Sequence, residues 1–376
     1  MKIWKKLKFP AQEFNLENTL VNGQCFNWRK IGDHHYEGVF SKYYVQVKRD
    51  NDAYVQYSTI PPNENPEKEQ LFEDQFKSYL NYDANIPELY EHWAQKDKRF
   101  SQIAEPIHGV RCLRQDPWEC TVSFICSQCN NIKRITQLLE TLRKTVSQIV
   151  ALNQQSQFGS EICEIDQDDG TRRKIYQFPT VEQLQTATEK QLRELMFGYR
   201  AKYLVAISKQ IVDKGGQNWL ESLRGQPNEK IREELTSLPG IGSKVADCIA
   251  LFSLDCANSI PVDTHVFQIA LKLGYVKGLK KDSSLNNKLY LQIVQAFRDK
   301  FGDKAGWAHQ IMFAGDLKSF QEKISNSNSA NTSAQNSKKR KIDEIKDQEE
   351  EKEEEEIKVQ DVDTKRETRS KRRKLN

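Results

Sequence analysis

The sequence predicts an α+β protein, in which an N-terminal domain with an antiparallel β-sheet and helices precedes a mainly helical domain. Runs of aromatic and β-branched residues before residue 60 are typical of strands. From about residue 106 to 320, apolar residues recur at helical spacing and capping signals open several segments. The composition changes again after residue 320. We therefore predict domains at 1–105 and 106–320, followed by a tail at 321–376.

The first domain contains a predicted β-hairpin. Residues 43–47 and 54–57 favour strands, and the polar stretch 49–52 between them favours a turn. Residues 67–80 follow with a helical pattern. The tyrosines and tryptophans of this domain are expected to pack in its core rather than to stack on bases, as aromatic residues usually do.

The second domain should be built from helices. Asp116-Pro117 is a helix start, and residues 131–149 carry apolar side chains at helical spacing. Thr180 and Thr188 each open a capping box, in which a Gln three residues later completes the cap. Residues 153–176 are polar and are predicted to form a loop insertion. Further helices are expected at 202–213, 287–301 and 305–313.

Charge and cysteine content narrow the class of protein. The chain has 376 residues and a formal net charge of +4, so a basic surface for nucleic acid would have to be local. Eight cysteines without a secretory signal favour reduced thiols inside the cell. No apolar run has the length of a membrane span, and none near the start has the length of a signal peptide.

The tail is predicted to be disordered. Residues 325–337 are almost entirely small and polar, and an acidic run follows at 349–356. Basic clusters at 338–341 and 369–374 flank that run and fit nuclear import, although a solubilising tail would have a similar composition. We expect a nuclear protein, and a mitochondrial pool stays open.

The stretch from Leu238 to Cys248 predicts a glycine hairpin between two helices, spanning 231–254. Pro239-Gly240-Ile241-Gly242 marks a tight turn, because glycine adopts backbone angles that other residues resist. Backbone amides at such a hairpin and helix start form a site for an anion such as a phosphate. Lys244 lies in the first helical turn, where the helix dipole disfavours a cation and so helps to make a neutral amine.

A carboxylate follows Lys244 in the sequence, close enough for a turn to bring it back toward the lysine. Asp263 comes nineteen residues after Lys244, and Pro261 before it favours a turn that brings the carboxylate back toward the second helix. Cys248 shares a helix face with Lys244. An amine near a carboxylate can act as a nucleophile whose cationic transition state the carboxylate stabilises. A surface lysine and a helix-capping aspartate are the simpler interpretation.

Several further motifs join these two in one order. They are Gly23-Gln-Cys-Phe-Asn-Trp28, Leu113-Arg-Gln-Asp-Pro-Trp-Glu-Cys120, Phe124-Ile-Cys-Ser127, Asn130-Asn131-Ile132 with Arg134, Phe197-Gly-Tyr-Arg-Ala-Lys-Tyr203, Pro261-Val-Asp-Thr-His265 and Ala305-Gly-Trp-Ala308. Their order and spacing resemble eukaryotic-type 8-oxoguanine DNA glycosylases of the helix-hairpin-helix superfamily. The resemblance runs from residue 1 to about 317.

The resemblance implies a base-excision-repair enzyme that removes 8-oxoguanine, and ring-opened purines, from double-stranded DNA opposite cytosine. Lys244 would attack the sugar, and the resulting Schiff base would permit strand cleavage by β-elimination. Asp263 would stabilise the cationic sugar and help to position the lysine. The protein would act without a cofactor or metal, as a monomer, on duplex DNA and not on a membrane.

Recognition residues are implied in the same way. Around the damaged base, Cys248 and Phe313 would sandwich the ring, the Gly23 carbonyl would accept the proton that oxidation adds, and His309 would contact the Watson–Crick edge. Around the opposite cytosine, the implied residues are Cys129, Asn130, Asn131, Arg134 and Arg200, with Tyr199 as a wedge. His265 would lie near the lesion's 5′ phosphate, and Gly240 and Gly242 would anchor the DNA backbone.

Two positions depart from the family pattern. Cys129 stands where the family has the first of three asparagines, and a thiol cannot supply the hydrogen bonds of an amide. His309 stands where the family commonly has a glutamine, so base affinity or its pH dependence is expected to differ.

Two alternatives compete with this interpretation. Cys126 and Cys129 have the spacing of a redox or metal pair, but no second cysteine pair or thioredoxin-like context accompanies them, so ordinary thiols are favoured. The four-cysteine pattern of iron–sulfur relatives is also absent. A non-catalytic protein that binds DNA damage through the hairpin would share the phosphate anchor, but it would have no need of Lys244.

Overall fold

The computed structural model describes residues 2–62, 65–152, 161–166, 170–280, 283–318 and 320–325, without the side chains of 147–152. Residues 1–320 form one compact unit, and residues 321–376 are separate from it. Most of the predicted disordered tail, from residue 326 onward, lies outside the described residues. The fold below is therefore that of the first unit.

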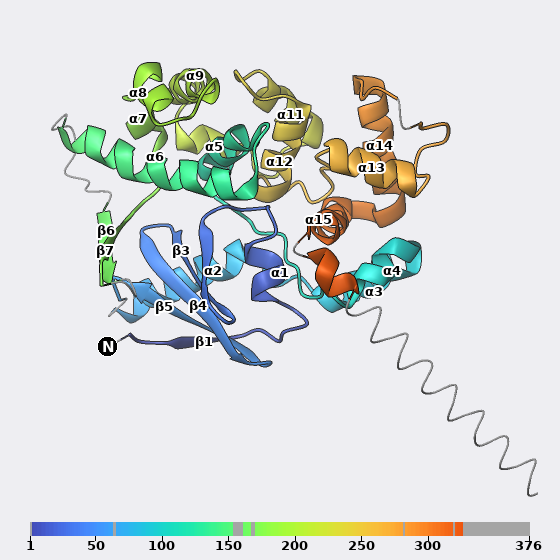
Figure 1. Ribbon diagram of the computed structural model, residues 1–376, viewed down its shortest axis with the longest axis horizontal. Helices are drawn as coiled ribbons and strands as arrows, with labels where there is room; N and C mark the ends of the chain where they lie inside the picture. Colours follow the sequence, from blue (N-terminus) through green and yellow to red (C-terminus); the bar gives the residue numbers. More distant parts are fainter. Residues whose placement is uncertain are drawn as a thin grey trace, which may run out of the picture. The chain divides into compact units, whose positions relative to one another are not determined.

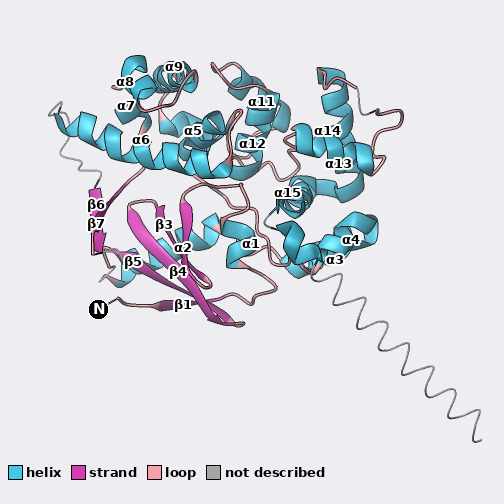
Figure 2. Cartoon of the chain, viewed as in Figure 1, coloured by secondary structure: helices cyan, strands magenta, loops and turns pink. Residues whose placement is uncertain are grey.

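An antiparallel sheet of five strands forms the base of this unit (Figures 1 and 2). In chain order the strands are β1 (Lys5–Lys8), β2 (Trp28–Gly32), β3 (His35–Phe40), β4 (Tyr43–Asn51) and β5 (Tyr54–Ile60). Their spatial order is β1-β5-β4-β3-β2. The predicted hairpin is confirmed, since β4 pairs with β5 around a turn in which the Asn51 side chain accepts hydrogen bonds from the Ala53 and Tyr54 amides.

Aromatic side chains fill the space between the sheet and helix α2 (Pro66–Tyr79). Phe72 and Phe76 of α2 pack against Tyr57 of β5, with ring centroids 5.5 and 5.9 Å away. The Trp28 indole donates a 2.9 Å hydrogen bond to the Tyr79 hydroxyl. The prediction that these aromatic residues form a core is thereby confirmed.

The remainder of the unit is mainly helical, as predicted. The short helix α1 (Leu16–Leu20) lies before β2. After the sheet come α3 (Ile86–Lys96), α4 (Lys98–Ala104), α5 (Pro117–Ser127), α6 (Ile132–Leu152), α7 (Val181–Leu184), α8 (Glu189–Glu194), α9 (Arg200–Asp213), α10 (Gln217–Ser222), α11 (Asn228–Thr236), α12 (Ser243–Ser253), α13 (Thr264–Lys272), α14 (Asn287–Phe301) and α15 (Ala305–Asp316). Both predicted capping boxes are present, at Thr180 and at Thr188.

The prediction of a loop over 153–176 is wrong for its second half. Residues Glu161–Asp166 and Arg172–Tyr176 form an antiparallel pair, β6 and β7. Tertiary contacts explain why a polar stretch forms strands. Ile175 is buried against Val39 and Tyr44 of the main sheet, and Arg173 pairs with the buried Glu37. Residues 153–160 and 167–169 lie outside the described part.

Helices α3 and α4 pack against the last helices of the chain, although the sequence pattern places them in the first domain. The Trp93 indole donates to the Phe301 carbonyl at 3.2 Å, and Asp97 accepts from Tyr275 and Lys300. Figure 1 shows these helices beside α15. The domain boundary near residue 105 stays a prediction, and α3 and α4 support the helix that carries His309 and Phe313.

Candidate functional site

The hairpin has the predicted form, with α11 and α12 on either side of it. Gly240 has a φ of +84°, and a Cβ atom there would lie 2.4 Å from Cγ of Tyr203 in α9, so only glycine fits. Gly242 has an ordinary extended conformation and caps α12, and a Cβ atom there would meet nothing within 4 Å. The two glycines thus serve different ends. Gly240 makes the turn, and Gly242 leaves open space at the start of α12, where an anion can approach the amides.

Lys244 lies in the first turn of α12, half-buried beside an aromatic ring. Its Nζ atom is 5.4 Å from the centroid of Phe124, a residue of α5 that the sequence analysis did not place in the site. One turn later, Cys248 is buried. Burial raises the pKa of the Cys248 thiol to about 11, and the nearby Lys244 amine opposes this only in part. Cys248 therefore presents a neutral, polarisable sulfur at neutral pH.

Asp263 caps helix α13. Its Oδ1 atom accepts a 2.9 Å hydrogen bond from the Val266 amide. The carboxylate also acts on the site, because its charge raises the pKa of both Cys248 and His309. The capping role and the proposed catalytic role are thus compatible. Lys244 and Asp263 form no direct ion pair among the described residues. The charges of both residues change the pKa values of the same two side chains, Cys248 and His309.

A buried polar cluster joins α12 to the segment that leads to Asp263. We call Arg232, Asp247, Ser259 and Tyr290 the Asp247 cluster. Asp247 accepts hydrogen bonds from Ser259, at 3.0 Å, and from the Tyr290 hydroxyl, while Arg232 approaches it at 3.5 Å. The Tyr290 hydroxyl also accepts from the amide of Val262 at 3.3 Å. Because Val262 directly precedes Asp263, the cluster holds the carboxylate relative to the helix that carries Lys244.

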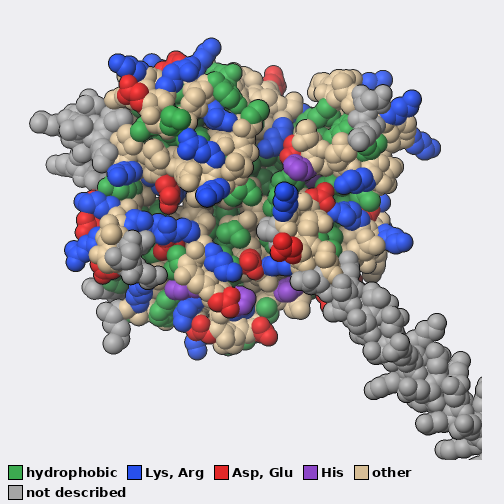
Figure 3. Space-filling view, in the orientation of Figure 1, with side chains coloured by type: hydrophobic (Ala, Val, Ile, Leu, Met, Phe, Trp, Pro, Cys, Tyr) green, Lys and Arg blue, Asp and Glu red, His purple; other side chains and the backbone are tan. Residues whose placement is uncertain are grey.

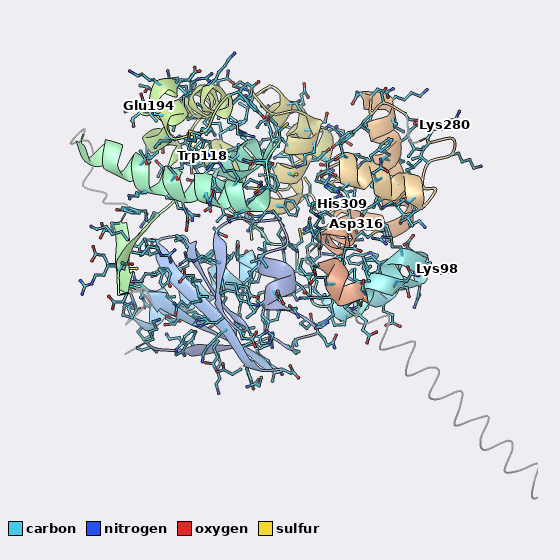
Figure 4. The ribbon with its side chains drawn as sticks, in the orientation of Figure 1. Lys98, Trp118, Glu194, Lys280, His309 and Asp316 are labelled. Carbon is cyan, nitrogen blue, oxygen red and sulfur yellow. The ribbon has the colours of Figure 1, made fainter. Side chains whose placement is uncertain are left out.

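Helix α15 carries two further predicted residues, His309 and Phe313. Figure 4 labels His309 on this helix. A Cβ atom at Gly306 would lie 2.4 Å from the Ser259 carbonyl oxygen, so α15 is packed tightly against the segment after α12. His309 of the same helix is 3 % exposed, and neither ring nitrogen has a hydrogen-bond partner among the described residues. The backbone of Gly306 raises the pKa of His309 slightly, although it does not form a hydrogen bond of standard geometry with the ring.

The His309 ring is neutral at physiological pH. Burial lowers its pKa to about 4, an effect that Asp263 opposes and Lys244 reinforces. Among the described aromatic side chains, only Phe297 contacts the His309 ring, in an edge-to-face arrangement with the ring centroids 5.8 Å apart. An uncharged imidazole with one donor and one acceptor nitrogen is thus held unpaired next to Lys244 and Asp263.

Gly23 lies beside Phe313. Gly23 has a φ of +86°, and a Cβ atom there would lie 3.8 Å from the Phe313 ring and 3.3 Å from the Ile132 side chain. The ring of His265 lies edge-on to Phe313, with centroids 5.9 Å apart. Gly23, Phe313 and His265 therefore line one surface, although they come from distant parts of the chain.

The neighbour of Gly23 fixes that residue to the helical core. Gln24 is fully buried, donates to the carbonyls of Thr19 and Arg111, and accepts from the Leu113 amide at 2.8 Å. The Gln115 side chain donates a 2.7 Å hydrogen bond to the backbone carbonyl of Gln24. The backbone amide of Gln115 donates to the Phe252 carbonyl at the end of α12. A short chain of hydrogen bonds thus connects the Gly23 turn to the helix that carries Lys244.

The remaining predicted residues lie on what we call the loop surface, formed by residues 128–134 and 196–200. The Gln128 side chain donates a 2.7 Å hydrogen bond to the Gly240 carbonyl. The backbone carbonyl of Gln128 accepts hydrogen bonds from the Arg200 guanidinium and the Tyr199 hydroxyl. The guanidinium of Arg200 lies 4.7 Å from the Tyr199 ring. Gln128 therefore links the hairpin to Tyr199 and Arg200, a role that no sequence signal indicated.

The two asparagines of the loop surface make local hydrogen bonds. Asn130 donates to the Cys126 carbonyl at 3.1 Å, and Asn131 caps α6 by accepting from the Arg134 amide at 2.9 Å. Cys129 before them is exposed and has a φ of +48°, a conformation that favours glycine or asparagine. Both asparagines thus have a structural role in the protein itself, and Cys129 adopts a backbone conformation that suits the family's asparagine better.

A cavity of about 440 Å³ opens beside the hairpin. Gln128, Gly240, Gly242, Lys244 and Asn286 are among the residues that line it. The space is thus bordered by the amine and by the turn predicted to anchor phosphates. Figure 3 shows hydrophobic side chains near the middle of one face, with lysine and arginine side chains around them.

No group of three His, Cys, Asp or Glu side chains suited to a metal occurs in the described residues. Within the same residues, no helix has the length and apolar character needed to cross a membrane. Cys126 is buried and Cys129 exposed, both as free thiols.

Two family models match consecutive parts of the chain. Residues 6–121 match the family described as "8-oxoguanine DNA glycosylase, N-terminal domain", and residues 122–292 match "HhH-GPD superfamily base excision DNA repair protein". The "N-glycosylase/DNA lyase OGG1" of Arabidopsis thaliana is 36% identical over 317 residues, which cover 84% of this chain and 80% of that protein. The chain belongs to the 8-oxoguanine DNA glycosylase family.

Two other relatives agree. The "N-glycosylase/DNA lyase" of Saccharomyces cerevisiae is 32% identical over 373 residues and covers 91% of this chain and 92% of its own length. The 8-oxoguanine glycosylase/lyase of Clostridium acetobutylicum, solved with double-stranded DNA containing cytosine opposite 8-oxoguanine, is 28% identical with a TM-score of 0.66. That alignment covers 84% of this chain and 96% of the bacterial one. The predicted family and the α+β fold class are therefore confirmed.

Proposed function

We propose that this protein is a bifunctional DNA glycosylase and lyase that removes 8-oxoguanine opposite cytosine from double-stranded DNA. The observation that carries the proposal is that Lys244 lines the cavity beside the hairpin, and that its charge and that of Asp263 both act on the buried His309 and Cys248. The names of its relatives, N-glycosylase/DNA lyases and a glycosylase solved with this lesion pair, support the same activity.

Lys244 supplies the nucleophile. Its amine attacks the anomeric carbon of the sugar, the bond to the damaged base breaks, and the base leaves with the bonding electrons and takes up a proton. Loss of a proton from nitrogen and opening of the sugar ring give a Schiff base. Removal of a proton from the adjacent sugar carbon then expels the 3′ phosphate by β-elimination. The Asp263 carboxylate, fixed by its hydrogen bond to Val266, stabilises the positive charge that develops on the sugar.

Recognition of the lesion falls to the surface around Gly23. The Gly23 carbonyl accepts a hydrogen bond from the proton that oxidation adds to the base, and normal guanine lacks that proton. Cys248, neutral because its pKa is raised to about 11, and Phe313 enclose the ring. His309 contacts the Watson–Crick edge with an unprotonated imidazole.

Recognition of the opposite strand falls to the loop surface. Arg134 and Arg200 read the cytosine, supported by Asn130 and Asn131, and Tyr199 fills the gap left by the extruded base. His265 lies near the 5′ phosphate of the lesion. The hairpin at Gly240 and Gly242 binds the DNA backbone without regard to sequence.

Borohydride trapping tests the chemistry. Reduction of the Schiff base on duplex DNA that contains 8-oxoguanine opposite cytosine should leave a covalent protein–DNA adduct. Lys244→Gln should bind the same duplex and give no adduct. Wild-type protein that gives neither adduct nor strand cleavage would refute the lyase activity. Multiple-turnover release of the base would dispose of the non-catalytic alternative, which no observation favours.

We further propose that the protein acts in the nucleus, on the basis of the basic clusters at 338–341 and 369–374. Substitution of both clusters by alanine should abolish nuclear accumulation of a fluorescent fusion and leave excision by the purified protein unchanged. Accumulation that persists without the clusters would refute this assignment.

A further inference from the structure

Met196 is an exposed apolar residue with a strained backbone. Its side chain is 69% exposed, the largest value among the large hydrophobic residues that the structure describes. Its φ is +67°, in the left-handed region that disfavours a residue with a side chain. Such strain costs free energy and is typically found where function requires it.

The position of Met196 connects it to the surface that meets DNA. The Met196 carbonyl accepts a 3.4 Å hydrogen bond from the guanidinium of Arg134. Tyr199, three residues later, is 44% exposed, and Ile132, which borders Gly23 and Phe313, is 37% exposed. Three of the nine exposed large hydrophobic side chains of the described residues therefore lie on one surface, next to two arginines.

This combination of side chains suits one occupant. Arginines attract the phosphates of DNA, and exposed apolar side chains beside them can enter between base steps that have lost stacking. Methionine is well suited to such a role because it is unbranched and adapts to irregular gaps. A protein partner is less well matched, because the surface is continuous with the loop that the proposed function assigns to the cytosine opposite the lesion.

We propose that Met196 is a second wedge, which enters the duplex beside Tyr199 on the strand that carries the opposite base. The inference rests on the proposed function, since the occupant is the DNA from which the damaged base has been extruded. The two wedges differ in kind. The Tyr199 ring is tied by its hydroxyl to the Gln128 carbonyl, whereas the Met196 side chain is free to adjust to the base steps it meets.

Met196→Gly is the decisive variant. Glycine adopts a φ of +67° without strain, so the substitution removes the side chain without disturbing the fold, and the thermal melting temperature should stay the same or rise. Affinity for a duplex with a tetrahydrofuran abasic analogue opposite cytosine should fall about 10-fold, as for the loss of one inserted side chain. The slope of log Kd against log salt should not change, because Met196 carries no charge.

A fluorescent base separates insertion from simple contact. With 2-aminopurine next to the opposite cytosine, wild-type protein should raise the fluorescence by unstacking that base, and Met196→Gly should raise it much less. Met196→Leu should restore most of the signal and affinity. Leu71→Ala, which removes an exposed apolar side chain from α2, should match wild type in every measurement.

Two failures can be told apart. If Met196→Gly matches wild type in affinity and in fluorescence, the wedge is refuted while the proposed function stands. If wild-type protein neither excises 8-oxoguanine nor is trapped by borohydride, the proposed function itself has failed.

Discussion

The catalytic region and the loop surface are built in opposite ways. Around Lys244, the hydrogen-bonded Asp247 cluster joins two helices and the segment before Asp263, and His309 is buried without a hydrogen-bond partner among the described residues. On the loop surface, Met196 and Tyr199 are exposed while Arg200 is buried, and two residues other than glycine, Cys129 and Met196, adopt positive φ angles. The residues proposed for the chemistry therefore lie beside a hydrogen-bonded frame, whereas those proposed to contact the opposite strand include exposed and strained residues.

This difference explains why a departure from the family pattern is tolerated at Cys129. A change in the buried frame leaves a polar group unpaired or causes a steric clash, which costs about 1–3 kcal/mol. A change such as Cys129 on the exposed surface costs little in stability and alters only what is recognised. Four substitutions or conditions test the contrast, from the largest expected effect to the smallest.

Asp263→Asn should separate the carboxylate's charge from its capping role. Asparagine caps a helix about as well as aspartate, so the melting temperature should change little. Excision should slow about 100-fold or more, because the stabilisation of the cationic sugar is lost. Single-turnover excision and a thermal melt measure the two effects. A large loss of stability with little loss of rate would show that capping is the main role of Asp263.

His309 should make stability depend on pH. Its pKa is 6.5 in the unfolded chain and about 4 in the folded one, so the unfolded state binds more protons between these values. Above pH 6.5 the His309 ring is neutral in both states, and protonation does not lower the free energy of unfolding. As the pH falls from 6.5 toward 4, the unfolded state takes up a proton that the folded state does not, and the free energy of unfolding decreases. Urea unfolding should therefore show a loss of about 2 kcal/mol from pH 7 to pH 5 through this residue.

His309→Gln is the control for that titration. The variant cannot take up a proton, so its unfolding free energy should fall less between the same two pH values. Identical losses in both proteins would contradict a buried neutral histidine at this position.

Tyr290→Phe should loosen the frame around Asp263. The change leaves Asp247 and the Val262 amide each without one partner, which should cost about 1–3 kcal/mol in unfolding free energy. The chemical step should slow about 10-fold with KM unchanged, because the carboxylate is displaced. Tyr275→Phe removes a similar bond, to Asp97 at the start of α4 and outside the Asp247 cluster, and should lower stability without slowing the chemical step.

The reaction rate is the informative readout in this comparison. If both tyrosine variants lower stability and neither slows excision, the Asp247 cluster contributes to folding only.

Cys129→Asn should have the smallest effect on stability and a selective effect on recognition. Asparagine tolerates a φ of +48°, so the free energy of unfolding should rise by less than about 1 kcal/mol. The added amide should sharpen the preference for cytosine opposite the lesion by a few-fold. Excision rates against the four opposite bases measure this preference. Unchanged ratios would mean that Cys129 does not contact the opposite base.

The buried half of the site could be predicted from sequence, and the exposed half only in part. The hairpin, Lys244 and Asp263 carry strong local signals, because the turn demands glycine and the helix caps demand particular side chains. Gln128 carries no such signal, since its hydrogen bond to Gly240 spans 112 positions of sequence. Met196 carries none either, because strain and exposure are visible only in three dimensions.

The same reasoning accounts for the strands at 161–176. Each strand contains β-branched residues, Ile162 and Ile165 in β6 and Ile175 in β7, but charged residues separate them. The burial of Ile175 and the pairing of Arg173 with Glu37 depend on other elements. Contacts distant in sequence decided the structure there, as they did for α3 and α4.

The contact between Gly240 and Tyr203 has a consequence for how the protein would bind DNA. Tyr203 belongs to α9, the helix that begins at Arg200 with Tyr199 as its N-cap, so the proposed phosphate anchor and the side chains proposed to read the cytosine share one rigid support. In the proposed complex this support sets the distance between the backbone of one strand and a base of the other. We therefore expect a duplex with an extra unpaired nucleotide between these two points to bind poorly, whatever damaged base it contains.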